Sequence, residues 1–415
     1  MRAITACLAL FAAVLPPVFA VDLIVVPTIQ YAHQDLWVRT PSGRGPLTTA
    51  VAEVVRDQPV HILVFATRFS TGADGAAEVS YRASFIRPDG TPGTTKENLR
   101  LIPRKTGVDP RGIHKAVDLM AFVGTADDPL GEWRVVIEAT DLVGNVTAKQ
   151  EQRFTVVGNE VLSAPLPSSV YQERWFMNYH HKPMPQQLLE VIKYVAENPP
   201  AGARPRRDAE NGSWLGFFEQ VLADNPWLLS HVVTRLDHAR GRERELLSAL
   251  LAYAMRNKPG YDELLPGSAR EAFLAHRNET WPVPAAEPLT GDQLDVLWGR
   301  FFASGRYQPL RELVAVLAYL PYKNALDDYK KLETKPAKPG VDVQKSAVFQ
   351  AASWSLRSNI QHDKVARDYC EGILLRKELP EAEHRWLGGL FRLAVEELQK
   401  AAPPARAPEA GEPKT

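Results

Sequence analysis

The chain contains 415 residues, of which 49 are Lys or Arg and 49 are Asp or Glu, and 45% are hydrophobic. Nucleic acids and anionic membranes usually bind proteins that carry an excess of positive charge. The balanced charge therefore argues against either one as a partner, and the hydrophobic content is sufficient for large cores. At roughly 150 residues per domain, the length predicts two or three domains.

Residues 1–20 have the pattern of a secretory signal peptide. An apolar run from Ala6 to Leu15 ends at Pro16-Pro17, and Val18-Phe19-Ala20 then places small residues where signal peptidase requires them. We therefore predict cleavage after Ala20. The apolar run is too short to span a bilayer as a helix, which needs about 20 residues. The mature protein is expected to be periplasmic or secreted, with no integral membrane segment.

Cysteine usage is compatible with export but provides no covalent crosslink. Cys7 lies in the predicted leader, which leaves Cys370 alone in the mature chain. A single thiol cannot close an internal disulfide, so the fold must depend on its hydrophobic cores. Too few residues precede Cys7 for a lipoprotein signal. Cys370 lies on an apolar helical stripe, which favours a buried and unreactive thiol.

From residue 21 to residue 158 the hydrophobic pattern has the period of two that is typical of β-strands. The expected strands are Val60–Thr67, Val79–Phe85, Trp133–Ala139 and Gln152–Val157. Turns rich in Gly, Pro and Asp separate them, and the last two strands have hairpin spacing. Short strands with such turns predict an antiparallel β-sandwich over residues 21–158.

The last of these hairpins carries a family resemblance. Residues Asp128 to Val135, followed by Asp141 and by Gly144-Asn145, resemble the final hairpin of immunoglobulin-like sandwiches in secreted bacterial proteins. Pro88-Asp89-Gly90 is similar to an earlier turn of the same family. The resemblance covers about a third of the chain, which lacks the cysteine pair of antibody domains. It implies an immunoglobulin-like fold and a binding or spacer module, but no specific function.

After a proline-bearing linker, residues 159–170, the pattern changes to the helical period. Residues Leu188, Val191, Ile192 and Val195 follow the i, i+3, i+4, i+7 rule, and Thr290-Gly291-Asp292-Gln293 is a capping box. A clear apolar stripe runs from Trp386 to Leu398. We predict roughly nine to eleven helices and no strand over residues 171–400. The tail, residues 401–415, has no large apolar residue and is predicted to be disordered.

The helical half contains a faint internal repeat. Leu215-Gly216-Phe217-Phe218 is similar to Trp298-Gly299-Arg300-Phe301-Phe302, and Trp354-Ser355-Leu356 is a weaker third copy. Each copy is followed by a polar break and a second apolar helix. Stacked helix pairs of this kind predict a solenoid-like helical-hairpin array rather than a closed bundle. The whole chain resembles uncharacterised exported bacterial proteins that have an immunoglobulin-like front and a tetratricopeptide-like helical rear.

No motif in the sequence predicts catalysis, a metal or a cofactor. His180 and His181 form the most chemical-looking pair, but adjacent histidines on a helix point in different directions and no HExxH pattern lies nearby. His231 and His238 lie two turns apart on one predicted helix face without an evident third ligand. His362-Asp363 could form an oriented imidazole pair. At each position a structural role is the expected one.

The architecture favours a non-enzymatic protein that binds a protein or peptide through its helical array. The aromatic candidates for that contact are Trp175, Phe176, Tyr179, Trp214 and Trp227, although each type is more often found in a core. The alternative is a hydrolase or lyase of cell-envelope polymer, with His180 and His181 near the domain junction. Convergence of these polar groups on one pocket would favour the enzyme. A structural component of the envelope is a third possibility.

Overall fold

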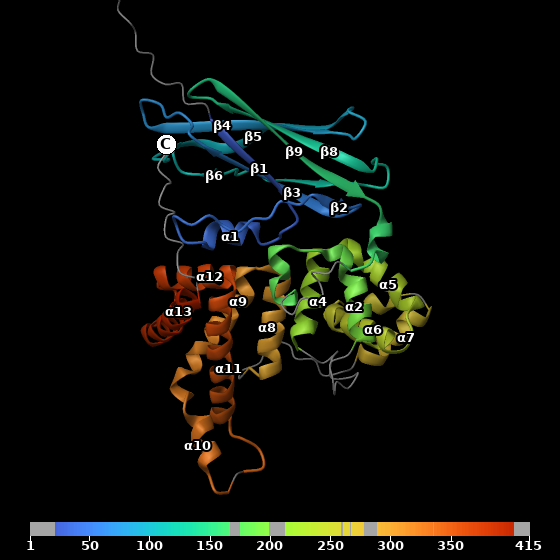
Figure 1. Cartoon of the computed structure of the whole chain (residues 1–415), viewed down its shortest axis with the longest axis vertical. Coiled ribbons are helices and arrows are strands. Elements are labelled where there is room, and N and C mark those ends of the chain that lie inside the picture. The colour runs from blue at the N-terminus through green and yellow to red at the C-terminus, as the bar shows by residue number, and fades with distance from the viewer. Residues whose placement is uncertain are drawn as a thin grey trace, which may run out of the picture. The chain divides into compact units, whose positions relative to one another are not determined.

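The computed structural model describes residues 21–166, 175–198, 212–258, 260–265, 267–277, 289–334 and 336–401. The predicted leader, part of the predicted linker and nearly all of the predicted tail lie outside these residues. The chain divides into two compact units: residues 21–28 with 50–157, and residues 29–49 with 158–401. The first unit consists of strands and the second of helices, which confirms the prediction of a mixed β and α protein (Figure 1). No helix among the described residues is long and apolar enough to cross a bilayer.

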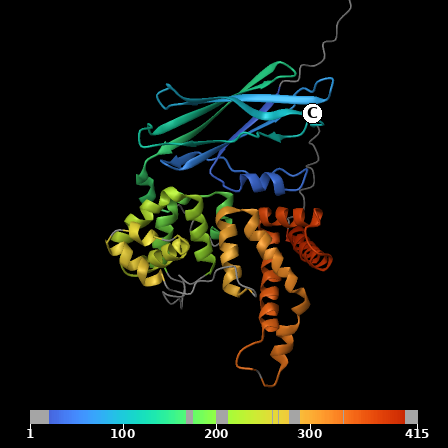
Figure 2. The same ribbon diagram turned by 180° about the vertical axis from the view of Figure 1, so that it is seen from behind.

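The strands of the first unit form two sheets, which Figure 2 shows from behind. In the first sheet, β3 (Pro59–Thr67) lies between β1 (Asp22–Thr28) on one side and β6 (His114–Lys115) and β7 (Met120–Val123) on the other. The second sheet has the order β2 (Glu53–Val55), β9 (Val146–Val157), β8 (Gly131–Asp141), β4 (Ala76–Ile86) and β5 (Pro92–Thr106). All pairs are antiparallel except β2 with β9.

Aromatic side chains from both sheets meet in the core of this unit. The ring of Phe122 on β7 lies 4.8 Å from that of Trp133 on β8, 5.2 Å from that of Phe154 on β9 and 5.3 Å from that of Phe85 on β4. The alternation along β8 buries every second residue from Trp133 onward and leaves the residues between them partly exposed, as expected for a strand with one face in a core.

The β8–β9 hairpin predicted from the family resemblance is present, and Asp141 shapes its turn. One carboxylate oxygen of Asp141 accepts hydrogen bonds from the backbone N–H groups of Val143 and Gly144, each at 3.0 Å. The other accepts one from the N–H of Ser70 at 2.6 Å. Asn145 adopts a φ of 52°, which asparagine tolerates better than most residues. The four strands predicted from periodicity coincide with β3, β4, β8 and β9.

The helical unit contains no strand among its described residues. Its longer helices are α1 (His33–Arg39), α2 (Leu188–Glu197), α4 (Gly212–Asp224), α5 (Leu229–His238), α6 (Gly241–Met255), α7 (Gly267–Arg277), α8 (Gly291–Ser304), α9 (Tyr307–Ala315), α10 (Ala325–Lys331), α11 (Val341–His362), α12 (Lys364–Leu375) and α13 (Glu381–Ala401). Short 3-10 helices are η1 (Asn159–Ser163), η3 (Phe176–His181), η4 (Pro185–Gln187), η5 (Pro226–Leu228), η6 (Tyr261–Leu264) and η7 (Val316–Tyr322). The capping box at Thr290 begins α8 as predicted, and Cys370 is fully buried in α12.

The repeated sequence motifs lie on helices that contact one another directly. Helices α4 and α8 cross at Gly216 and Gly299: a Cβ atom on Gly216 would lie 2.1 Å from the carbonyl oxygen of Val296, and one on Gly299 would lie 2.0 Å from that of Ser213. The weaker third copy is joined to the second, because the indole of Trp298 donates to the hydroxyl of Ser355 at 3.0 Å. In a solenoid each repeat contacts its neighbours along the chain. Since α5 to α7 separate α4 from α8 in sequence, the predicted solenoid is not confirmed.

One segment differs from the predicted domain boundaries. Residues 29–49 were expected to belong to the β domain, but they pack with the helices. The carboxylate of Asp35 accepts a hydrogen bond from the N–H of Tyr307 at the start of α9, at 3.0 Å. Arg44 forms ion pairs with Asp368 at 3.2 Å and with Glu371 at 2.7 Å on α12. The helical unit is therefore discontinuous in sequence, which the local hydrophobic pattern did not indicate.

Alanine at Gly216 or Gly299 should destabilise the protein, although alanine normally stabilises a helix interior relative to glycine. The added Cβ would meet backbone atoms that cannot rotate away, so we expect each substitution to lower the free energy of unfolding by about 1–3 kcal/mol or more. Gly389→Ala is the matched control, because its Cβ would meet nothing within 4 Å. Chemical denaturation of the variants would measure the difference, and equal effects at all three positions would contradict the close helix crossing.

Candidate functional site

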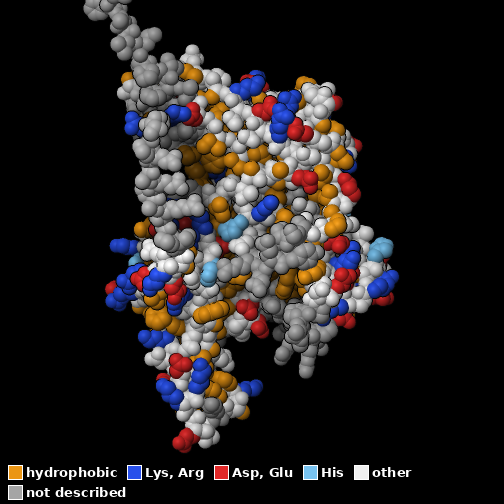
Figure 3. Space-filling model, viewed as in Figure 1, with side chains coloured by type: hydrophobic (Ala, Val, Ile, Leu, Met, Phe, Trp, Pro, Cys, Tyr) orange, Lys and Arg blue, Asp and Glu red, His pale blue; other side chains and the backbone are white. Residues whose placement is uncertain are grey.

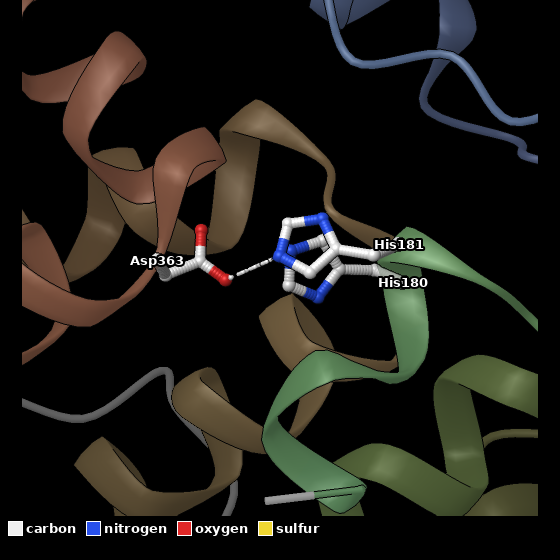
Figure 4. Close-up of side chains that lie close together, drawn as sticks. All are labelled: His180, His181 and Asp363. Atoms are coloured by element: carbon white, nitrogen blue, oxygen red, sulfur yellow. Dashed lines mark hydrogen bonds and ion pairs between the residues drawn. The ribbon is translucent and has the colours of Figure 1, made fainter. Parts of the chain in front are cut away.

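Two histidines and one aspartate that are far apart in sequence meet inside the helical unit (Figure 4). The Nε2 atoms of His180 and His181, at the end of η3, lie 3.1 Å and 3.0 Å from the same oxygen, Oδ2 of Asp363. Asp363 lies between α11 and α12. The side chains of His180 and Asp363 are 2% and 5% exposed, whereas that of His181 is 22% exposed. The cluster is thus nearly enclosed, with its opening at His181.

The side chains of His180 and His181 converge although the two residues are adjacent in a short helix. An α-helix was expected here, and in an α-helix neighbouring side chains diverge. The histidines instead end a 3-10 helix, and the next residue, Lys182, has a φ of −142°. Their rings lie with centroids 4.0 Å apart, and the ring of His180 also packs 5.1 Å from that of Phe301. The expected divergence of the two rings is therefore wrong.

The inserted segment, residues 29–49, holds the backbone of the histidine pair. The amide of Gln30 donates to the carbonyl oxygens of His180 at 2.9 Å and His181 at 3.3 Å. The hydroxyl of Thr49 donates to the same carbonyl of His181 at 2.7 Å. The N–H of Thr49 in turn donates to the side-chain oxygen of Gln30 at 2.7 Å. Both ends of the segment thereby fix the peptide groups that carry the imidazoles.

The carboxylate of Asp363 is stabilised in its charged form. Burial by itself raises the pKa of this group, but His180 and His181 lower it more, and the pKa lies well below its ordinary value. Its second oxygen, Oδ1, accepts a hydrogen bond from the N–H of Ala366 at 2.8 Å and caps α12. The positive end of the helix dipole also favours a negative charge there.

The nitrogen atoms of the two histidines are poorly satisfied by hydrogen bonds. Both ring nitrogens of His180 and the Nδ1 atom of His181 are buried without a hydrogen-bond partner in the described part of the chain. The contact of His180 with Asp363 is close, at 3.1 Å, but is not aligned as a hydrogen bond. Cys370 is close enough to interact with the charge of Asp363. Burial, and to a lesser extent that charge, raises the pKa of the Cys370 thiol to about 12. The thiol is therefore protonated at neutral pH, whereas the three other groups can hold a proton or a cation.

A small cleft lies beside Asp363. Its volume is about 110 Å³, and it is lined by Met177, Asn178, Ser358, Asn359, His362 and Asp363. The side-chain nitrogen of Asn359 donates to the carbonyl of Ser355 at 2.9 Å, while its Oδ1 is buried without a partner. His362 bonds through Nδ1 to the carbonyl of Ser358 at 2.8 Å. The expected pairing of His362 with Asp363 is thus replaced by the two distant histidines.

Trp354 is an exposed aromatic residue on the same helix. It is 73% exposed and lies one helical turn before Ser358 on α11. Charged side chains of both signs are interspersed on the neighbouring α10–α11 hairpin, as Figure 3 shows. In the sequence Trp354 is visible only as part of a weak repeat, because its exposure depends on the packing of α11 against η7 and α13.

The aromatic residues predicted to contact a partner pack against the helical core instead. The ring of Phe176 lies 4.8 Å from that of Trp214, and the ring of Tyr179 lies 5.5 Å from that of Trp175. Trp227 donates from its indole to the side chain of Asn225 at 3.2 Å. These positions favour a structural role, and their part in partner binding stays a prediction. His231 and His238 lie on α5 and do not join the histidine cluster.

The β unit contains a larger cavity, of about 460 Å³. Phe85, Phe122 and Trp133 line its interior, and Arg87 and Lys96 add two basic groups to its wall. The sequence did not indicate this cavity, because Phe122 lies on a strand of only four residues, which is too short to be recognised from its hydrophobic period.

Comparisons with known proteins do not identify the chain. No family model and no curated protein match it. Among solved structures, the sporulation control protein Spo0M of Bacillus subtilis is similar at 14% identity over 34% of this chain and 53% of its own, with a TM-score of 0.21. An immunoglobulin-like protein of Pseudomonas aeruginosa has 15% identity over 33% of this chain and 95% of its own, with a TM-score of 0.18. The chain spans about half the length of the first, and likenesses this weak support no argument.

Replacing Gln30 by alanine should weaken the helical unit through the histidine backbone. The substitution removes a nearly buried amide that donates to two carbonyl oxygens, so we expect a loss of about 1–3 kcal/mol in the free energy of unfolding. Gln344→Ala is the matched control, since that amide also donates to a backbone carbonyl, of Pro339 at 3.2 Å, but is exposed. It should change stability by less than about 0.5 kcal/mol. Hydrogen exchange at the backbone amide of Lys182 should be faster in Gln30→Ala but not in Gln344→Ala, which would locate the effect at the histidine pair.

Proposed function

We propose that the chain is a non-enzymatic protein that binds a peptide or a peptide segment of another protein through its helical unit. The observation that supports this is the exposure of Trp354, which is 73% exposed on α11, the helix that also carries Asn359 of the small cleft. An exposed tryptophan is typical of a recognition surface, because tryptophan dominates many interfaces. The unpaired Oδ1 of Asn359 offers a separate polar contact on the same helix, because buried polar atoms are rarely left unpaired.

The proposed ligand places an apolar side chain on Trp354 and a hydrogen-bond donor against Oδ1 of Asn359. The cleft has the size of one small side chain, and five of the six residues that line it carry hydrogen-bonding groups. A peptide supplies both a donor and an apolar group. In this proposal the β unit is an immunoglobulin-like spacer, and residues 1–20 direct the protein to the periplasm or beyond.

The alternative of an envelope hydrolase or lyase has less support. His180 and His181 do converge with an acid, as an enzyme would require, but the side chains of His180 and Asp363 are 2% and 5% exposed. A polymer chain needs an open groove around its catalytic groups. Within the described residues, the small cleft is lined by Asp363 but not by His180 or His181. A hydrolase or lyase function therefore stays the alternative prediction.

Trp354→Ala should weaken peptide binding without unfolding the protein. Peptides selected from a random library against the whole protein would be measured by fluorescence anisotropy, and the variant should bind them roughly 30-fold more weakly, as for a typical hot spot. Its stability should change by less than about 0.5 kcal/mol, because the side chain is exposed. Leu375→Ala is the control, since Leu375 is 66% exposed on another helix. Failure to select any peptide, or equal affinity for both variants, would contradict the proposal.

The cavity of the β unit favours a second binding function, for a small amphiphile. Its volume lies within the usual range of ligand pockets, about 300–1,000 Å³. The aromatic lining suits an acyl chain, and Arg87 and Lys96 suit a carboxylate, while the acid that also lines the cavity, Asp128, accepts a hydrogen bond from Thr125. We propose a medium-chain fatty acid as the class of ligand.

A fluorescent fatty-acid analogue should bind the whole protein and be displaced by the unlabelled acid. Arg87→Ala should weaken binding about tenfold, since a hydrogen bond to a charged group contributes roughly 1.5–3 kcal/mol. Arg104→Ala is the matched control, because Arg104 is an exposed arginine that pairs with Asp74 and does not line the cavity. Absence of saturable binding, or an equal loss in both variants, would exclude this second function.

A further inference from the structure

We propose that His180, His181 and Asp363 bind one divalent transition-metal ion, of the class of Zn²⁺ or Co²⁺, and thereby join η3 to the corner between α11 and α12. The three ligand atoms, one from each side chain, all lie within 4.8 Å of one another. This inference is independent of peptide binding. It concerns residues for which the sequence led us to expect a structural role.

The distances within the cluster are slightly shorter than those between ligands of a shared ion. Zinc binds imidazole nitrogen at about 2.0–2.1 Å and carboxylate oxygen at about 2.0–2.2 Å, so two ligands in its preferred tetrahedral arrangement lie about 3.4 Å apart. The observed separations of the two Nε2 atoms from Oδ2 of Asp363 are 3.1 Å and 3.0 Å. A common ion fits between them with a modest adjustment of the side chains.

The direction of the His180 contact supports the same conclusion. In a hydrogen bond the N–H group points at the acceptor oxygen. The Nε2 atom of His180 lies 3.1 Å from Oδ2 but is not aligned for such a bond, and it is buried. Ligands of one ion have this arrangement, because both lone pairs point at a third position and not at each other. Only His181 forms an aligned contact with the carboxylate.

The chemistry of the ligands selects the type of ion. Two imidazoles and one carboxylate favour borderline metals such as Zn²⁺, Co²⁺, Ni²⁺ or Fe²⁺ over the hard ions Ca²⁺ and Mg²⁺, which prefer oxygen. Gln30, Thr49 and the cap on α12 hold the three groups in place. Water can complete the coordination at the side of His181, which is 22% exposed.

The surroundings also set the expected strength of binding. Metal-bound histidines usually donate from the second ring nitrogen to a carboxylate or carbonyl, and loss of that partner weakens affinity 10–100-fold. Neither Nδ1 atom of the pair has such a partner among the described residues. We therefore expect a dissociation constant in the micromolar range rather than the nanomolar range of a complete zinc site.

The test uses the whole mature protein, purified without a histidine tag and freed of metal with a chelator. Equilibrium dialysis against Zn²⁺ should give one ion per chain, and Co²⁺ should produce a visible absorption band that Zn²⁺ removes. A hundredfold excess of Zn²⁺ over its dissociation constant should raise the melting temperature by about 5–10 °C. No stoichiometric binding at millimolar metal would overturn the proposal, and the cluster would then be a hydrogen-bonded ion pair only.

Two variants and a matched control assign the ion to this site. His181→Ala removes a partly exposed ligand and Asp363→Asn keeps a side chain that can cap α12, so both are expected to fold. Each should weaken Co²⁺ binding by roughly a hundredfold or more, beyond the effect of losing an outer partner. His238→Ala, at an exposed histidine of α5, should leave affinity unchanged. Binding that survives in both variants, or that falls equally in His238→Ala, would place the ion elsewhere and contradict the assignment.

Discussion

The insertion of residues 29–49 among the helices is the constraint on which the architecture of the helical unit depends. Through Gln30 and Thr49 it fixes the carbonyl groups of His180 and His181, and through Asp35 and Arg44 it reaches α9 and α12. A backbone carbonyl buried without a donor costs about as much as a lost hydrogen bond, so the irregular end of η3 needs these side-chain donors. The histidine cluster is therefore a product of a segment remote from it in sequence.

The glycine contact between α4 and α8 serves the same cluster from the other side. Because Gly216 and Gly299 let the two backbones touch, α8 lies deep enough for Phe301 to pack against the ring of His180. Gly305, in a left-handed conformation with a φ of 65° at the end of α8, lies so close that a Cβ there would be 3.0 Å from Cδ2 of the same ring. Small residues thus create the space in which a charged carboxylate and two imidazoles meet.

What could be predicted from the sequence was local. The turn at Asp141, the capping box at Thr290 and the buried thiol of Cys370 each depend on a few neighbouring residues, and all three are confirmed. The cluster depends on a contact across 182 residues between His181 and Asp363, and no periodicity reports such a contact. The repeat around Gly216 and Gly299 was recognised, and the structure adds that its copies pack directly against each other, while the predicted solenoid is not confirmed.

The discontinuity of the helical unit has a consequence for the order in which the protein can fold. Residues 29–49 leave the ribosome first, yet their partners on α9 and α12 follow more than 250 residues later, as in the hydrogen bond from Tyr307 to Asp35 across 272 positions. Contacts of such long separation form slowly, because the intervening chain must first be closed into a loop. Until α9 and α12 are complete, their contacts with α1 cannot form. The helical unit can therefore close only after both of these helices have been synthesised.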